Sequence, residues 1–174
     1  MKKMSLAKGS IMLTNKVMMY TDGAAIGNPG PGGYGVVLLY NNHRKELSGG
    51  YRLTTNNRME LLALIKGLES LKTQNLEVHI YTDSKYVSDS IEKKWVFTWA
   101  KKNFKNKKNS DLWKQFLLFY PLQKIQVHWV KGHSGIKENE RCDQLATAAA
   151  QNTHLLIDEE YENEKETPDN SNLF

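Results

Sequence analysis

Four acidic residues fall where a carboxylate is costly unless something balances its charge. Asp22 and Asp83 each follow directly on a strand-like run of residues. Glu60 and Asp143 stand at helical spacing beside apolar or small residues. Isolated carboxylates in such surroundings do not stay ionised, whereas carboxylate oxygens are the preferred ligands of hard divalent cations such as Mg²⁺. The acids together therefore predict a site for two such ions, which can stabilise the entering and the leaving oxygen of a phosphoryl displacement.

Each acid also has an ordinary interpretation that involves no metal. Asp22 and Asp83 can be turn and cap residues. Glu60 can interact with the dipole of a helix in its first turn, and Asp143 can be a surface acid. We favour the metal site because a chance coincidence of all these settings is much rarer than any one of them.

The segment 22–33 determines where the first acid lies. It contains five glycines and two prolines in twelve residues, and proline lacks a ladder donor while glycine favours tight turns. We therefore expect a strand over 16–22 that ends in a loop at Asp22, and a second strand over 34–40. A third strand over 45–53 completes an antiparallel meander.

The rest of the chain alternates helices and strands. We expect a buried helix over 59–71 capped by Asn56, a strand over 76–82, and a short helix over 85–91. A further helix is capped by Ser110 or Asp111 and ends near Tyr120. A fifth strand over 124–130 and a last helix from Glu138 or Asn139 follow. This order predicts two parallel crossovers and an α/β fold.

Charge is divided unevenly along the 174 residues. The net charge is +5, but residues 155–174 contain seven acids against Lys165, which leaves +11 for residues 1–154. Residues 93–114, which we call the basic protrusion, combine eight lysines with five aromatic residues and one acid. A strongly basic body indicates a polyanionic partner. The acidic end has little apolar content and is expected to be disordered.

Other classes of protein are disfavoured. The single cysteine, Cys142, excludes an intramolecular disulfide and suits a reducing compartment. No apolar run approaches the length of a membrane span, and residues 1–15 lack the apolar core of a signal peptide. We therefore expect a cytoplasmic protein without a membrane partner, a monomer, and a disordered leader over 1–15.

Six stretches closely resemble, in order, the motifs of type 1 ribonuclease H, the bacterial ribonuclease HI in particular. They are Tyr20–Gly23, Gly27–Gly35, Thr54–Leu61, Thr82–Ser84, Trp129–Gly135 and Glu138–Asp143. The resemblance covers about residues 16–152, which we expect to form the catalytic domain, followed by a disordered acidic tail over 153–174. It implies a ribonuclease H fold, with a five-stranded mixed sheet in the order 3-2-1-4-5 flanked by helices. It also implies hydrolysis of the RNA strand of RNA/DNA hybrids, leaving 3′-hydroxyl and 5′-phosphate ends.

The resemblance assigns roles to the catalytic residues. Asp22, Glu60, Asp83 and Asp143 match the ligands of two Mg²⁺ ions, for which Mn²⁺ is a substitute. His133 matches a mobile histidine that shuttles protons or helps the product leave. The residues agree, since Gly132 and Gly135 give the loop freedom and histidine exchanges protons near neutral pH. The ordinary alternative is a surface loop histidine.

Substrate contacts follow from the same resemblance. Asn28, Asn56 and Asn57 match contacts to sugars and base edges of the hybrid, while Thr55 and Asn109 match a pocket for a phosphate of the DNA strand. The family often has an arginine where this chain has Leu53. The basic protrusion resembles a substrate-binding handle and contributes Trp95, Trp99, Lys101, Lys102 and Lys105, although its aromatic residues could equally belong to the core.

Two other functions remain open at this point. Enzymes of the same fold that cut DNA are disfavoured by the fourth acid, the His133 loop and the basic protrusion. A non-catalytic module that only binds hybrids is disfavoured because none of the four acids is missing.

Overall fold

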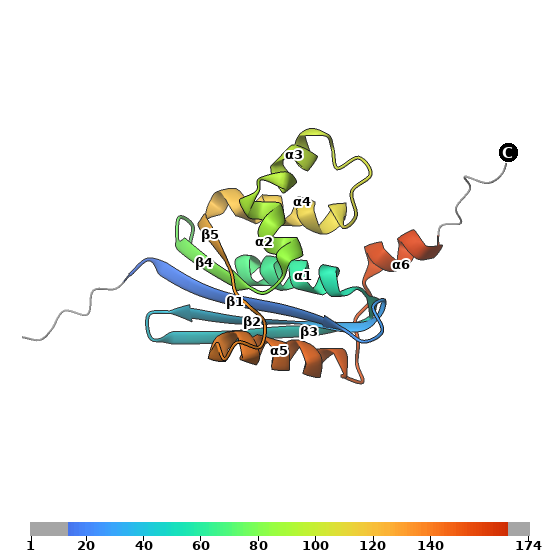
Figure 1. Cartoon of the computed structure of the whole chain (residues 1–174), viewed down its shortest axis with the longest axis horizontal. Coiled ribbons are helices and arrows are strands. Elements are labelled where there is room, and N and C mark those ends of the chain that lie inside the picture. Colours follow the sequence, from blue (N-terminus) through green and yellow to red (C-terminus); the bar gives the residue numbers. More distant parts are fainter. Residues whose placement is uncertain (1–13, 167–174) are drawn as a thin grey trace, which may run out of the picture.

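The computed structural model describes residues 14–166, and its centre is one five-stranded sheet (Figure 1). The strands are β1 (Lys16–Ala25), β2 (Gly30–Tyr40), β3 (His43–Thr54), β4 (Glu77–Thr82) and β5 (Lys124–Trp129). Their order is β3-β2-β1-β4-β5. The first three strands pair antiparallel, and β4 pairs parallel with both β1 and β5. The expected mixed sheet and its order are confirmed.

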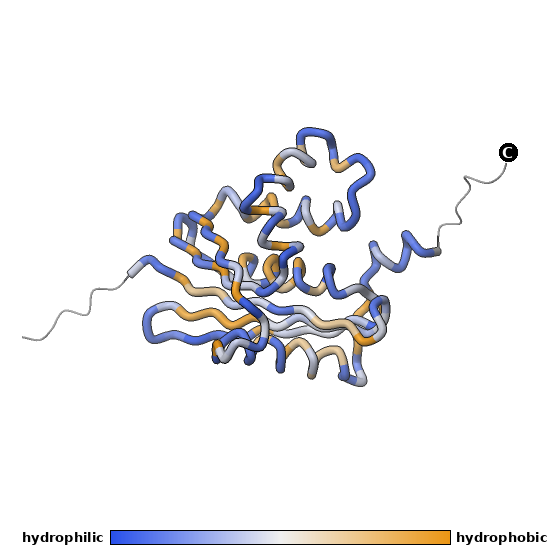
Figure 2. Tube along the Cα trace, viewed as in Figure 1, coloured by the Kyte–Doolittle hydropathy of each residue, from blue (hydrophilic) through white to orange (hydrophobic). Residues whose placement is uncertain are grey.

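Helices cover both faces of the sheet, as Figure 1 shows. On one face lie α1 (Asn56–Glu69), α2 (Lys85–Glu92), α3 (Trp95–Lys101) and α4 (Ser110–Phe119), which a 3₁₀ turn over Tyr120–Leu122 follows. The other face carries α5 (Lys137–Ala150). The larger core lies between the sheet and α1, where Met19, Val36 and Leu64 are completely buried. Figure 2 shows the hydrophobic residues along the central elements and mostly hydrophilic residues along the basic protrusion.

The glycine-rich segment after Asp22 differs from its prediction. Strand β1 continues to Ala25 and β2 already begins at Gly30, so the first strand does not end at Asp22. The glycines serve close packing instead: a Cβ added at Gly33 would lie 2.3 Å from the carbonyl oxygen of Ala146. Helix α5 can therefore press directly on this part of the sheet. Only the short connection around Gly27, whose φ is +82°, is a true turn.

Helix α1 begins earlier than the prediction, and its cap is different. The N-cap is Thr55, whose hydroxyl oxygen accepts the backbone N–H of Arg58 at 3.3 Å, and Asn56 is the first helical residue. Glu60 therefore lies in the second turn, which removes its interpretation as a first-turn dipole partner. Helix α4 likewise has Asn109 as its N-cap rather than Ser110 or Asp111.

Residues 153–166 of the acidic tail are ordered where disorder was expected. After α5 the chain pairs with β3 through a bridge between Leu156 and Tyr51, and Asp158 is buried. Helix α6 (Glu159–Glu166) follows. The prediction failed because it considered only local composition, whereas Asp158 binds the buried Arg58 at 2.7 Å. The predicted disorder of residues 1–13 and 167–174 concerns parts of the chain outside the described residues.

At the other end, the backbone carbonyl of Asn15 accepts the N–H of Glu77 at 2.9 Å, so the chain is already attached to the sheet before β1 begins. Within residues 14–166, no helix is both long and apolar enough to cross a membrane.

Candidate active site

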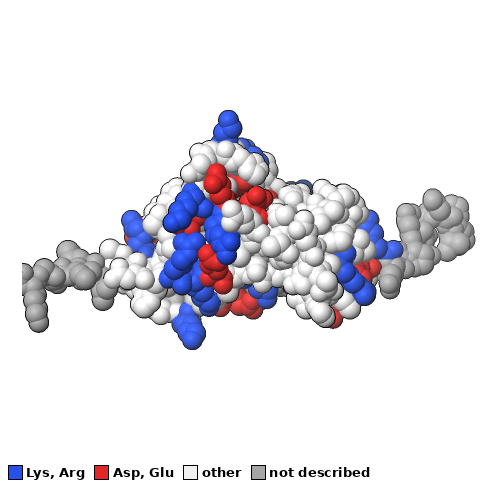
Figure 3. Space-filling view, turned by 90° about the horizontal axis from the view of Figure 1, so that it is seen from below, with Lys and Arg blue, Asp and Glu red and all other residues white. Residues whose placement is uncertain are grey.

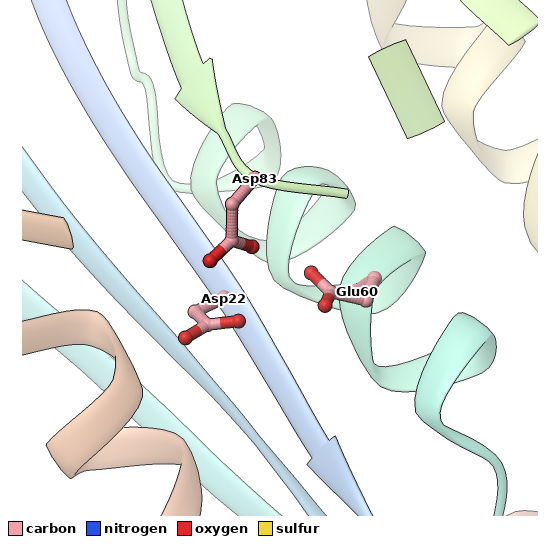
Figure 4. A group of neighbouring side chains, drawn as sticks. All are labelled: Asp22, Glu60 and Asp83. Carbon is pink, nitrogen blue, oxygen red and sulfur yellow. The ribbon is translucent and has the colours of Figure 1, made fainter. Parts of the chain in front are cut away.

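Three of the predicted acids converge from three different elements, and Figure 4 shows their carboxylates facing one another. Asp22 lies on β1, Glu60 on α1, and Asp83 directly after β4. One carboxylate oxygen from each lies within 4.8 Å of the other two. We call these three residues the acid cluster.

The sheet topology explains why the acid cluster forms. Strands β1 and β4 are parallel neighbours with Thr21 opposite Thr82, so the next residues of the two segments, Asp22 and Asp83, lie side by side. Helix α1 reaches them because β1 has a glycine at its point of approach. A Cβ added at Gly23 would lie 2.3 Å from the backbone nitrogen of Glu60.

Asp22 and Glu60 resist ionisation. Burial, followed by repulsion from Asp83 and Asp143, raises the pKa of Asp22 to about 7, although the Gly23 N–H donates to its Oδ1 at 2.8 Å. Burial, followed by the charges of Asp22 and Asp83, also raises the pKa of Glu60 well above its ordinary value. The causes are therefore loss of water and close like charges. Both would be relieved by a bound cation.

Glu60 shows the same demand at one atom. Its Oε1 accepts a long bond of 3.4 Å from Asn56 Nδ2, whereas its buried Oε2 has no hydrogen-bond partner among the described residues. A buried carboxylate oxygen without a donor is unfavourable in any protein. Hard divalent cations bind such oxygens, so the residues present fit a metal site.

Asp143 and His133 were predicted to belong to the same site as Asp22, Glu60 and Asp83, but they are not members of the acid cluster. Asp143 is half-buried on α5 and close enough for its charge to affect Asp22. His133 is exposed in the loop between β5 and α5, with a φ of 52°, and Gly135 in the same loop has a φ of +84°. The metal-ligand and proton-transfer roles of these two residues stay predictions.

Sequence reasoning missed the residues that hold Asp83. The indole N–H of Trp129 donates to the carbonyl oxygen of Asp83 at 2.9 Å, and Lys85 Nζ lies 3.7 Å from the centre of the indole ring. The amide of the buried Asn139 donates to Asp83 Oδ2 at 3.5 Å. Asn139 could have been found, because it precedes Asp143 by four residues and so shares its helix face.

A polar cavity of about 420 Å³ lies beside the acid-bearing end of α1. It contains four of the predicted substrate contacts, namely Asn28, Thr55, Asn57 and Asn109. Its other lining residues are Pro29, Lys108, Tyr161, Glu164 and Lys165. We call it the Thr55–Asn109 cavity. Asn56, the other asparagine among the predicted contacts, donates its backbone N–H to Asn28 Oδ1 at 2.9 Å and thereby links the two segments.

Asn109 is held firmly in this cavity. Its amide nitrogen donates to the hydroxyl of Tyr86 at 3.0 Å, and its Oδ1 accepts from Arg58 at 3.4 Å. The indole N–H of Trp113 donates to the same Tyr86 hydroxyl at 2.8 Å. The core of the protein therefore fixes one wall of the cavity.

The basic protrusion presents charge rather than a continuous aromatic surface. Lys101, Lys102 and Lys105 are exposed. Trp95 is 43% exposed, whereas Trp99 packs edge-on against the buried Trp113 with ring centres 6.0 Å apart. The aromatic residues are thus divided between surface and core, and their contact with substrate stays a prediction.

The opposite side of the molecule differs in its charges. Figure 3, which looks from the side of α5, shows basic side chains next to acidic ones left of centre, with smaller charged groups near the right edge and the top. Arg44 pairs with Glu46 and Glu138, and Arg141 also pairs with Glu46. These cations already have protein partners, unlike a surface that awaits a polyanion.

Comparison with known proteins agrees with this geometry. A protein-family model described as RNase H matches residues 14–151. A Ribonuclease H of Rippkaea orientalis is 57% identical over 153 residues, covering 85% of this chain and 93% of the relative. A Ribonuclease H of Desulforamulus reducens is 56% identical over 148 residues, covering 82% of this chain and 92% of the relative.

Solved structures are similar as well. The crystal structure of LC9-RNase H1, described as a type 1 RNase H with the type 2 active-site motif, is similar with a TM-score of 0.72 and 32% identity. The alignment covers 81% of this chain and 74% of that one. LC11-RNase H1, crystallised in complex with an RNA/DNA hybrid, gives a TM-score of 0.58 at 26% identity, covering 77% of this chain and 96% of that one.

Proposed function

This chain belongs to the ribonuclease H family, and from that premise we propose that it is an endonuclease that hydrolyses the RNA strand of RNA/DNA hybrids. The observation that carries the proposal is the acid cluster. One carboxylate oxygen of each of its three residues lies within 4.8 Å of the other two, and the buried Oε2 of Glu60 has no hydrogen-bond donor among the described residues. The relative whose crystal contains an RNA/DNA hybrid supports the choice of substrate.

We propose that the acid cluster and Asp143 hold two divalent cations, Mg²⁺ with Mn²⁺ as a substitute. The charge of four carboxylates matches that of two such ions, and Asp143 lies close enough to influence Asp22. When bound, the ions supply a more acidic water and neutralise charge that develops on the phosphate. Asn139 and Trp129 act as positioning residues because they hold Asp83 from two sides.

The bond changes of this hydrolysis balance with water as the only other reactant. The water oxygen forms a bond to phosphorus while the bond from phosphorus to the 3′ oxygen breaks, which leaves 3′-hydroxyl and 5′-phosphate ends. His133 can take a proton from the water side or deliver one to the leaving oxygen. Its exposed loop position lets it do so without occupying the acid cluster.

We propose that the Thr55–Asn109 cavity receives a phosphate of the DNA strand. The side chains of Asn28, Asn56 and Asn57 are suited to pair with 2′-hydroxyl groups and base edges in the minor groove. The exposed lysines of the basic protrusion add phosphate contacts that are independent of sequence.

A gel assay with end-labelled RNA/DNA, RNA/RNA and DNA/DNA duplexes, with Mg²⁺ or with EDTA, tests the proposal. We expect cuts only in the RNA strand of the hybrid and only with Mg²⁺. The RNA fragments should be substrates for enzymes that extend a 3′-hydroxyl. Cleavage of the DNA duplex would instead indicate a DNA-cutting relative, and tight binding of the hybrid without cleavage would indicate a binding module.

A further inference from the structure

The C-terminal segment is attached to the body at three successive points. Leu156 forms two backbone hydrogen bonds with β3: its carbonyl oxygen accepts the N–H of Arg52 at 2.9 Å, and its N–H donates to the carbonyl oxygen of Gly50 at 2.9 Å. Asp158 is buried against Arg58. On α6 itself, Glu162 pairs with Arg52 at 2.8 Å. Helix α6 therefore has a defined place on the molecule.

Arg58 relates that place to the two helices that begin at the Thr55–Asn109 cavity. It lies in the first turn of α1, binds Asp158 with Nε and Nη2 at 2.7 Å each, and binds Asp111 with Nη1 and Nη2 at 2.9 and 2.7 Å. Asp111 is in the first turn of α4. The hydroxyl of Thr54 also donates to Asp158 at 2.7 Å. One buried guanidinium thus fixes α6 relative to both α1 and α4.

The consequence is that α6 forms part of the cavity wall. Tyr161, Glu164 and Lys165 of α6 line the Thr55–Asn109 cavity together with the two residues that give it its name. Lys165 Nζ lies 5.7 Å from the centre of the Tyr161 ring, and the Arg58 guanidinium carbon lies 5.7 Å from it too. The tail therefore brings a cation, an acid and an aromatic ring to a cavity whose other lysine comes from the basic protrusion.

We propose that α6 is part of the substrate-binding surface, with Lys165 contacting the DNA-strand phosphate that enters the Thr55–Asn109 cavity and Glu164 weakening its binding. The inference rests on the proposed function and adds these two residues to it. A phosphate gains from releasing counterions at a lysine and loses from a nearby carboxylate. Leu53, at the end of β3, contributes no charge of its own.

Two substitutions with opposite signs test this. Lys165→Gln should raise the Michaelis constant for the hybrid by about threefold to fivefold at low salt, and should reduce the slope of log affinity against log salt by about 0.7 to 0.9. Glu164→Gln should lower the Michaelis constant by about twofold to threefold. In both variants kcat should stay within about twofold, because neither residue belongs to the acid cluster.

Matched controls separate a local contact from general charge. Glu160→Gln makes the same charge change on α6, but Glu160 lies on the side toward Lys66 and Asp158 and does not line the cavity. Lys72→Gln removes a lysine near the far end of α1. Both controls should leave the Michaelis constant within about twofold of the parent. Thermal unfolding of all four variants verifies that the exposed substitutions leave the fold intact.

Neutral phosphate replacements locate the contact. Hybrids with single methylphosphonates along the DNA strand should include one position at which Lys165→Gln has no further effect on binding, measured with Ca²⁺ in place of Mg²⁺. If no position along the DNA strand behaves in this way, or if Lys165→Gln and Glu164→Gln match the controls while the parent cuts hybrids, the inference is wrong and the proposed function stands. If the parent does not cut hybrids, both are wrong.

Discussion

Asp22 offers a way to separate the stability of the acid cluster from its chemistry. Its side chain is 6% exposed, and its pKa is raised from 3.8 to about 7 by burial and by repulsion from Asp83 and Asp143. Between these two values the folded protein binds more protons than the unfolded chain. The free energy of unfolding must therefore fall as pH rises from about 4 to about 7 when no metal is present.

The size of the effect follows from the shift. A rise of about three in the pKa, at 1.36 kcal/mol for each unit, lowers the free energy of unfolding by at most about 4 kcal/mol between pH 4 and pH 7. Asparagine has nearly the same shape, can accept the bond from the Gly23 N–H, and does not ionise. We expect Asp22→Asn to be more stable than the parent by about 1 to 4 kcal/mol at pH 7 in EDTA. Each kcal/mol should raise Tm by about 2 to 4 °C.

Thermal unfolding at pH 4 and pH 7, with EDTA or Mg²⁺, measures this. The advantage of Asp22→Asn should shrink at pH 4, where Asp22 of the parent is neutral. Mg²⁺ should stabilise the parent at pH 7 and hardly affect the variant, which should also lose cleavage while still binding hybrids in Ca²⁺. Asp89→Asn, outside the acid cluster and paired with Lys93, is the control and should change stability by less than about 1 kcal/mol. A variant less stable than the parent at pH 7, or equally favoured at pH 4, would refute the reasoning.

Three other outcomes are expected. His133→Ala should slow turnover by about tenfold to a thousandfold without ending it, because proton transfer by one histidine is a partial contribution; complete loss with an intact fold would mean a structural role for the loop. Replacing four lysines of the basic protrusion by Gln, namely Lys101, Lys102, Lys105 and Lys107, should raise the Michaelis constant with little change in kcat. The slope of log affinity against log salt should shrink by about 0.7 to 0.9 per lost contact, and an unchanged slope would mean that these lysines do not contact the substrate. Arg58→Met should lower the free energy of unfolding by about 3 to 5 kcal/mol, since Asp111 and Asp158 lose a buried partner; denaturant unfolding that shows less than about 1 kcal/mol would contradict this.

The sequence predicted what depends on patterns within an element. Apolar runs and turn signals were enough to locate all five strands and the helix that carries Glu60, and the idea that buried acids need a common partner led to the three that converge. The order of the strands came from the resemblance to a family, because pairing between distant segments leaves no local pattern.

The failures also have a common physical cause. The glycines after Asp22 were interpreted as a loop, but all of them except Gly27 lie in paired strands, where Gly23 lets α1 approach and Gly33 lets α5 approach. Asp158 was assigned to a disordered tail, but it accepts hydrogen bonds from the buried Arg58, one hundred residues earlier in the chain. In each case the deciding neighbour lies far away in the sequence, where composition and periodicity carry no information.

The pairing of Arg58 with Asp158 has a consequence for how the protein is made. Residue 58 leaves the ribosome long before residue 158, and until then the guanidinium can form its bonds to Asn109 and Asp111 but not those to Asp158. The last steps of folding must therefore wait until residue 158 has been synthesised. A chain shortened to residue 151, where the match to the family ends, would contain every acid of the acid cluster and still lack a partner that its core requires.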